Sequence, residues 1–386
     1  MSKIINYIVL MTAILLVVSV IPFAIGEHDN GNGNSFDNKK RVIAQSEEEI
    51  SAAINAGCEL VRETRGISAF ICERDIADDL GLQEDIRVFA QDAGANSQIR
   101  ANLVHNTGNT GAGRKIVVLD TGYNYNHIEL VSSYLGGKDF VNNDSDPFDD
   151  NGHGSHVAGL ITADGVLAGT RGTAPGAGII AGKVLAFNGG GYFSDTITGI
   201  YWAVDGNDGV YGTADDFNAD AVSMSLGSSP PYTYKGYCDN VYPALTNAIK
   251  YARDRKVVVV SAAGNNGGAG VSLPGCISYS LTVGAVDSKD AIASFSGKGN
   301  SVDISSPGVN LLSAVLGSNY AYKSGTSMAT PVVSGVVALL KADNSTLTPA
   351  QTENALIKTA KDLGKRGKDS SYGYGRVDAY SAVNFI

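Results

Sequence analysis

Three widely separated segments contain side chains that could act together in nucleophilic catalysis. Asp120 follows the apolar run 115–119, His153 opens a segment rich in small residues, and Ser327 lies in Gly-Thr-Ser-Met-Ala before another apolar segment. A serine hydroxyl becomes an effective nucleophile when an imidazole takes its proton and a carboxylate orients that imidazole. We therefore predict that Ser327 is a nucleophile, His153 its general base and Asp120 the orienting acid.

Each of these segments, taken alone, has another interpretation. Asp120-Thr-Gly is also typical of aspartic proteases, but their chemistry needs two carboxylates, and the chain has no second Asp-Thr-Gly or Asp-Ser-Gly. His153 and His156 have a spacing that could bind zinc, but no third ligand and no glutamate base accompany them. Ser327 alone could be a helix N-cap. The order Asp, His, Ser favours a catalytic triad over these separate interpretations.

Alternating strands and helices from about residue 96 onward must bring the three segments together. This alternation predicts an α/β fold, a three-layer arrangement of one parallel sheet with helices on both faces. Open parallel sheets form their sites at the carboxyl ends of strands, where the sequence places Asp120. We expect strands at 115–119, 177–185, 221–225, 257–262 and 280–286, and helices at 153–163, 194–204, 242–255, 327–341 and 349–361.

The first 92 residues differ in character from the rest of the chain. Residues 1–26 combine Lys3, an apolar run and small residues before a cleavage point, which is typical of a secretory signal peptide. An uncleaved anchor at the outer face of the membrane is the alternative. Residues 27–38 are rich in Gly, Asn and Asp and are expected to form a linker. Residues 39–92 have short strand and helix patterns that predict a small α+β domain.

Composition limits the function classes. The 386 residues carry a net charge of −10, so the chain offers no positive surface for nucleic-acid phosphates. A hydrophobic fraction of 44% is sufficient for a substantial core. We therefore expect a folded protein that binds no nucleic acid.

Four cysteines, in a chain expected outside the cytosol, permit two disulfides. The sequence allows three pairings. Proximity along the chain favours Cys58 with Cys72 and Cys238 with Cys276.

The three motifs, in this order, resemble those of the subtilisin-like serine proteases, the subtilases. The similarity covers about 96–386 and ends in the closing motif 373–377. The resemblance implies a subtilisin-like fold for this domain and a propeptide domain at 39–92. It also implies a serine endopeptidase that is secreted, works as a monomer and cleaves protein or peptide substrates through an acyl-enzyme.

The resemblance also assigns further site residues. Segment 261–265 is similar to the subtilase oxyanion segment, which makes Asn265 the side-chain donor. The residues similar to those that bind the substrate and wall its pocket are Ser225, Leu226, Gly227, Ala262, Ala263 and Gly264. Because none of them is acidic, we expect a preference for large apolar residues before the cleaved bond.

Residues 205–220 alternate Asp, Asn and Gly, a pattern of hard oxygen ligands on a loop that suits Ca²⁺. The loop is similar to the calcium-loading insertion of some archaeal subtilases. A merely solvated acidic loop is the alternative. The expected calcium ligands are Asp205, Asp208, Asp215, Asp216 and Asp220.

The domain at 39–92 is similar to the subtilase propeptide, which assists folding and inhibits the enzyme until it is cut. We expect self-cleavage between about residues 89 and 96. Two other functions remain open at this point. The chain could be a binding protein on an inactive protease fold, or a lyase or esterase that uses the same triad. The strand motif at Ser225 favours peptides over simple esters.

Overall fold

The structure, a computed structural model, describes residues 39–64, 67–84 and 94–386. The chain divides into two units, residues 1–89 and 90–386, which are described separately below. The expected signal peptide (1–26), the linker (27–38) and most of the expected cleavage region (89–96) lie outside the described residues.

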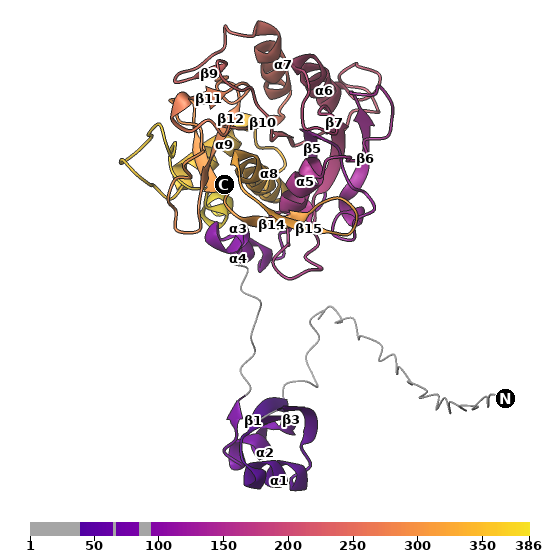
Figure 1. The fold of residues 1–386 in the computed structure, drawn as a ribbon, viewed down its shortest axis with the longest axis vertical. Coiled ribbons are helices and arrows are strands. Elements are labelled where there is room, and N and C mark those ends of the chain that lie inside the picture. The colour runs from indigo at the N-terminus through magenta and orange to yellow at the C-terminus, as the bar shows by residue number, and fades with distance from the viewer. Residues whose placement is uncertain (1–38, 65–66, 85–93) are drawn as a thin grey trace, which may run out of the picture. The chain divides into compact units, whose positions relative to one another are not determined.

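The N-terminal unit has the small α+β fold that its pattern predicts (Figure 1). Its four strands form an antiparallel sheet in the order β2-β3-β1-β4. Ser46 caps the first helix in a capping box with Glu49, and the Cys58–Cys72 disulfide is present. The elements are β1 (Lys39–Ala44), α1 (Glu47–Asn55), β2 (Glu59–Thr64), β3 (Ile67–Glu73), α2 (Arg74–Asp79) and β4 (Gln83–Glu84).

A seven-stranded parallel sheet forms the centre of the C-terminal unit. Its order is β13-β12-β10-β8-β5-β7-β6, so the chain adds β6 and β7 on one side of β5 and all later strands on the other. The strands are β5 (Lys115–Asp120), β6 (Tyr134–Asp139), β7 (Gly178–Lys183), β8 (Ala221–Met224), β10 (Val258–Ala262), β12 (Leu281–Val286) and β13 (Ile304–Pro307).

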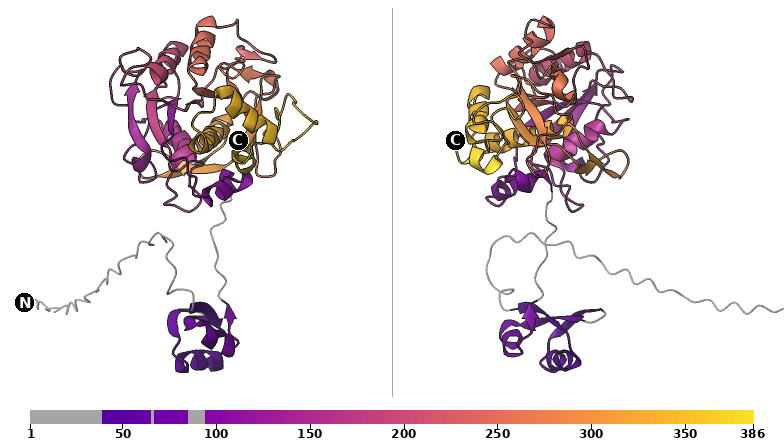
Figure 2. Two further views of the ribbon diagram at one scale, coloured as in Figure 1. Left: turned by 180° about the vertical axis from the view of Figure 1, so that it is seen from behind. Right: turned by 60° about the vertical axis from the view of Figure 1, so that its left-hand side comes forward.

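Helices cover both faces of this sheet, as the alternation of elements predicts (Figures 1 and 2). Side chains of β5 alternate between the two faces: Ile116 and Val118 belong to one core, Val117 and Leu119 to the other. The first core includes residues of α5 (His153–Thr162) and α8 (Thr326–Asp343), and the second includes residues of α6 (Phe193–Asp205) and α7 (Pro243–Asp254).

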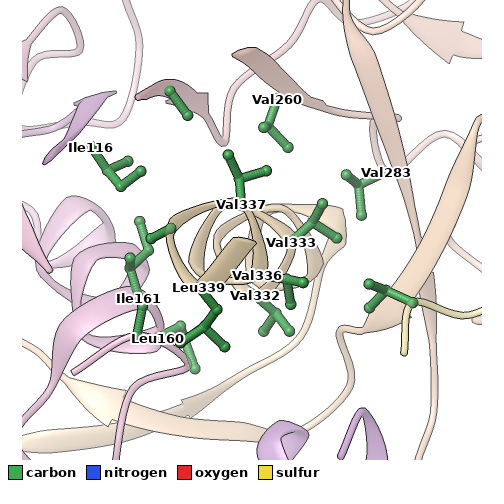
Figure 3. Packing of buried hydrophobic residues seen from close by; sticks show 14 of the residues in the cluster. Ile116, Leu160, Ile161, Val260, Val283, Val332, Val333, Val336, Val337 and Leu339 are labelled. Carbon is green, nitrogen blue, oxygen red and sulfur yellow. The ribbon is translucent and has the colours of Figure 1, made fainter. Parts of the chain in front are cut away.

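Helix α8 lies at the centre of the larger core (Figure 3). Val333 and Val337 extend from it toward strand residues that include Val260, while Leu339 lies beside Leu160 of α5. Because α8 is apolar around most of its circumference, it is buried between sheet and helix rather than exposed on one side. This burial fixes the helix whose first turn contains Ser327.

The remaining elements are short and lie in the C-terminal unit. They are α3 (Ala95–Gln98), α4 (Ala101–His105), β9 (Thr233–Tyr234), β11 (Val271–Ser272), β14 (Leu311–Ala314), β15 (Tyr320–Lys323), α9 (Pro349–Thr359) and α10 (Ala379–Val383), with the 3-10 turns Val131–Ser133 and Gly267–Ala269. The second disulfide joins Cys238 to Cys276, both of them buried. Within the described ranges, no helix has both the length and the apolar character needed to cross a membrane.

Candidate active site

Three of the predicted site residues lie at or just after strand ends where the order of the sheet changes direction. Asp120 is the last residue of β5, Ser225 directly follows the neighbouring β8, and Asn265 follows β10. A crevice outside the carboxyl ends of strands forms at such a change of direction in an open α/β sheet. The topology therefore places these residues at one edge of the sheet.

A short contact joins the side chains of His153 and Asp120. The imidazole Nδ1 of His153 lies 2.7 Å from Oδ1 of Asp120, and the backbone N–H of Thr121 donates to the same oxygen at 2.7 Å. Asp120 is 1% exposed. A buried carboxylate on Nδ1 leaves Nε2 as the nitrogen that can accept a proton, which is the arrangement a general base requires.

A second buried carboxylate, Asp149, holds the start of α5. Its Oδ1 accepts hydrogen bonds from the Thr121 hydroxyl and from the N–H groups of Asn151 and Gly152. Its Oδ2 accepts from the N–H and hydroxyl of Ser155. The carboxylate thus connects the segment after Asp120 with both sides of His153.

The helix carrying His153 also requires glycine at its second position. A Cβ on Gly154 would lie 2.2 Å from the carbonyl oxygen of Gly122, a distance that no side chain tolerates. The Gly154 N–H donates to the Thr121 hydroxyl at 2.8 Å. The small residue after His153 therefore permits the start of α5 to lie against the backbone of Gly122.

The two histidines of α5 have opposite electrostatic character. Burial opposes a charge on His153, but the charge and hydrogen bond of Asp120 outweigh it and raise the pKa of His153 above its ordinary value. Burial instead lowers the pKa of His156 to about 4. The Nε2 of His156 lies 3.1 Å from the Leu311 carbonyl oxygen and 3.0 Å from that of Ala321. His156 is therefore neutral near pH 7, and its Nε2 is directed at two backbone carbonyl oxygens.

Ser327 is the second residue of α8, at the positive end of the helix dipole. Its hydroxyl donates to the Ser225 carbonyl oxygen at 3.1 Å, while the Ser225 hydroxyl donates to the Ser327 carbonyl oxygen at 2.8 Å. Contacts between nucleophile and base are often loose before substrate binds. Among the described contacts, the Ser327 hydroxyl bonds Ser225 and makes no hydrogen bond to His153.

Asn265 is oriented by the residue next to the nucleophile. Its Oδ1 accepts the Thr326 N–H at 2.9 Å and the Thr326 hydroxyl at 3.1 Å. Because the amide oxygen is engaged, the amide Nδ2 is directed away from Thr326 and is available as a donor. The Gly264 N–H in turn donates to the Thr326 hydroxyl, so Thr326 connects two segments of the site.

A cavity of about 430 Å³ lies beside His153. Half of the expected substrate residues line it, namely Ser225, Leu226 and Gly227. Its walls contain no Asp, Glu, Lys or Arg. The cavity is lined by Thr121, Asn151, His153, Leu185, residues 189–193, Thr196 and residues 225–229.

The other three expected substrate residues are Ala262, Ala263 and Gly264. The side chains of Ala262 and Ala263 are buried, and neither they nor Gly264 line the cavity. A Cβ on Gly264 would lie 2.2 Å from the Ser272 hydroxyl oxygen, so this segment packs tightly against the next one. Leu185, residues 189–193 and Thr196 also form part of the wall, although no motif in the sequence pointed to them.

Comparison with known proteins agrees with this geometry. The subtilase family model matches residues 111–375, a span that contains Asp120, His153, Asn265 and Ser327. The chain belongs to the subtilase family of serine proteases. The prediction of a subtilisin-like fold and enzyme class is confirmed.

Several curated relatives resemble this subtilase. Subtilisin BL from Lederbergia lenta is 40% identical over 287 residues, which cover 74% of this chain and 97% of the relative. Subtilisin E from Bacillus subtilis (strain 168) is 36% identical over 74% of this chain and 70% of the relative. Thermophilic serine proteinase from Bacillus sp. (strain AK1) is 38% identical over 71% of this chain, and the match spans 62% of that relative.

The structure of this subtilase does not assemble the expected calcium ligands. Asp205 accepts the Tyr251 hydroxyl, Asp215 accepts N–H groups of Asn207 and Asp208, and Asp220 accepts the Lys115 N–H. Across the described residues, no three or more Asp, Glu, His or Cys side chains are grouped so that they could hold a metal ion.

The physical reason is that these carboxylates satisfy separate parts of the chain. Asp216 accepts the Gly212 N–H and Asp208 accepts the Val210 N–H, so each closes its own turn. Asp220 lies 3.7 Å from the guanidinium of Arg114. The five residues therefore do not fit one calcium site in this structure, and no step of the chemistry below depends on a metal.

Sequence reasoning missed the residues that support the triad. Lys183 is 1% exposed, and its ammonium donates to the carbonyl oxygens of Thr121 and Leu185 and to the Asp150 carboxylate. Asp149 and Thr326 were visible inside the catalytic motifs, but their roles depend on contacts between distant segments. The only signal for Lys183 was a charged residue inside an otherwise apolar strand pattern.

Proposed function

We propose that this subtilase is a secreted serine endopeptidase, made as a precursor that cleaves itself. The observation that carries the proposal is the 2.7 Å contact between buried Asp120 and His153, at the strand edge that also holds Ser327 and Asn265. Residues 1–26 support secretion, since their pattern is that of a signal peptide.

The first half of the reaction forms an acyl-enzyme. Substrate binding draws the Ser327 hydroxyl from Ser225 to Nε2 of His153, which takes its proton as Oγ attacks the peptide carbonyl carbon. The carbonyl π electrons move to oxygen. The imidazolium then gives the proton to the leaving amine, and the peptide C–N bond breaks. Water repeats the sequence on the ester and releases the acid.

Two donors stabilise the oxyanion. The Asn265 Nδ2 is free because its Oδ1 is held by Thr326, and the Ser327 N–H lies in the first turn of α8, where backbone donors lack helical partners. Donors fixed before the reaction stabilise charge that develops in the transition state.

The cavity supports a broad specificity with a preference for large apolar residues before the cleaved bond. Leu185, Phe193 and Leu226 provide apolar wall, and no acidic side chain there could pair with Lys or Arg in a substrate. The test is a peptide library analysed by mass spectrometry. Cleavage after basic residues alone would contradict this specificity.

We assign the N-terminal unit the role of intramolecular inhibitor and folding aid. The assignment rests on its size, on its position before the catalytic unit and on its own hydrophobic core. Cleavage near residues 89–96 then separates the two units. The mature enzyme is expected to be a monomer, and sedimentation measures this directly.

Labelling with a fluorophosphonate tests the catalytic assignment. The reagent should modify Ser327 and abolish peptide cleavage, while Ser327→Ala should resist labelling and accumulate as unprocessed precursor in a host without other proteases. Ser324→Ala is the matched control, because it removes a hydroxyl from the same segment that bonds only the Asn310 N–H among described contacts. Absence of labelling in folded wild type would favour the inactive binding protein instead.

A further inference from the structure

A lysine on strand β15 lies next to the catalytic histidine. The ammonium of Lys323 donates to the carbonyl oxygen of Gly152, the residue directly before His153, at 3.2 Å. The strand is paired with β14 (Leu312↔Tyr322), and it leads directly into the segment that carries Ser327. The pairing of β15 with β14 and the hydrogen bond to Gly152 therefore hold Lys323 beside His153, in the segment that leads to Ser327.

Charged groups reach His153 from three elements. Asp120 approaches from the end of β5, Asp149 from the loop before α5, and Lys323 from β15. Among the described groups that act on the charge of His153, Asp120 and Asp149 favour the imidazolium and Lys323 opposes it. Among these three groups, Lys323 is the one that disfavours a charge on His153, whereas the two carboxylates favour it.

The neighbouring histidine does not share this role. His156 contacts two carbonyl oxygens through Nε2, and its buried Nδ1 has no partner among the described residues. A protonated His156 would carry an unpaired buried N–H, which is costly. Its pKa of about 4 keeps it neutral in the range where His153 titrates.

We propose that Lys323 is a positioning residue that opposes the protonation of His153 and so extends the activity of this subtilase to lower pH. The inference rests on the proposed function, since it concerns the base of that reaction. A fixed positive charge disfavours a second positive charge nearby, and the effect is stronger where the surroundings are partly dehydrated.

The environment of Lys323 is consistent with this role. Burial lowers the pKa of its ammonium, and the charges of Asp149 and Asp120 act against that lowering. The carboxylates that favour a charge on His153 therefore also favour the charge on Lys323. Removing the lysine takes away the positive charge that opposes the two carboxylates at the imidazole and leaves burial as the effect acting against them.

The test measures how fast a fluorophosphonate inactivates the mature enzyme as a function of pH. Lys323→Met keeps the side-chain length but removes the charge, and Lys323→Arg keeps the charge. In Lys323→Met the acid limb of the rate profile should move to higher pH by about 0.3 to 1 unit. Lys323→Arg should leave it near the wild-type position.

Exposed Lys289 provides the matched control, since Lys289→Met makes the same change in net charge on a turn outside the site. An unmoved acid limb in Lys323→Met would overturn the proposal, as would an equal shift in Lys323→Arg or Lys289→Met. Wild type that reacts with the reagent at no pH would instead overturn the proposed function. The two failures are therefore distinguishable.

Discussion

At the residue scale, two buried carboxylates next to His153 have different roles because they have different partners. Asp120 bonds the imidazole, whereas all five hydrogen bonds to Asp149 come from backbone and hydroxyl groups. Burial would raise the pKa of Asp149, but the hydrogen bonds from Ser155, Gly152 and Asn151 outweigh it and hold the pKa below its ordinary value. Asp149 therefore stays ionised and fixes the helix, while Asp120 orients the base.

Asp120→Asn should distinguish two effects of Asp120 on His153, the orientation of the imidazole and the influence of the carboxylate charge on its protonation. An amide can donate to Nδ1 and favour the wrong tautomer, and in serine proteases this change lowers kcat by about 10⁴-fold. His153 must be neutral to act, so wild-type kcat/KM falls as the pH drops through a pKa raised above 6.5. Without the carboxylate charge, the residual activity should have its acid limb at lower pH. A pH profile with an unmoved limb would contradict this.

Asn265→Ala should reduce kcat and leave KM nearly unchanged, because the donor acts on charge that exists only in the transition state. In subtilisin, the reference case for this donor, its loss costs about 2.7 to 4 kcal/mol. Asn266→Ala is the control, since the Asn266 amide bonds the Ser272 hydroxyl and not the nucleophile segment. Steady-state kinetics on one peptide suffice. Equal losses in the two variants would point to a packing defect.

At the scale of elements, the site depends on strand ends that are held together. The buried Lys183, at the end of β7, bonds the carbonyl oxygen after Asp120, the carbonyl oxygen of Leu185 at the cavity wall and the Asp150 carboxylate. One ammonium therefore links the Asp segment, the His segment and the substrate wall. All three of its donors are used.

Lys183→Met should destabilise the catalytic unit by about 2 kcal/mol, since the buried Thr121 carbonyl oxygen loses its donor at about 1 to 3 kcal/mol and the partly buried Leu185 carbonyl oxygen loses its donor as well. Asp150→Asn should cost less, because its carboxylate is 46% exposed and the amide oxygen still accepts. Denaturant unfolding in a Ser327→Ala background avoids self-digestion. A Lys183→Met protein no less stable than Asp150→Asn would refute the role of Lys183 as a link.

The way a strand is buried decides whether its sequence predicts it. Strands β5, β10 and β12 are mostly apolar and almost entirely buried, and they were expected within a residue or two, because strands buried on both faces need apolar runs. Strand β6 has the sequence YLGGKD with a single buried residue, so it carries no such signal. Strand β2 was missed as well, and its pairing with β3 contains a register shift.

The same distinction applies to the site. Asp120, His153, Ser327 and Asn265 could be named because each lies in a motif with its own chemistry. Lys183 and Lys323 could not, since each acts through carbonyl oxygens, Thr121 and Gly152, that only folding brings near. The acidic loop shows the same limit: its composition suits calcium, but composition does not show that Asp205 accepts the Tyr251 hydroxyl and Asp220 the Lys115 N–H.

At the scale of the whole molecule, each unit has its own core and its own disulfide. Cys58–Cys72 lies in the N-terminal unit and closes a separation of 14 residues, while Cys238–Cys276 lies in the catalytic unit and closes 38. A unit of roughly 50 residues buries too little surface to be more than marginally stable, whereas a unit of roughly 300 does not need a crosslink to fold. The two bonds should therefore differ in importance.

Replacing both cysteines of one bond with serine, in the unprocessed Ser327→Ala chain, tests this difference. Loss of Cys58–Cys72 should lower the free energy of unfolding of its unit by about 3 kcal/mol, and loss of Cys238–Cys276 should lower that of the catalytic unit by about 4 kcal/mol. In calorimetry, Cys58→Ser/Cys72→Ser should abolish the transition of the N-terminal unit near 37 °C and leave that of the catalytic unit in place. Cys238→Ser/Cys276→Ser should lower only the catalytic transition. Transitions that move together in either variant would mean that the units unfold as one, and the N-terminal unit could not then act as a separable folding aid.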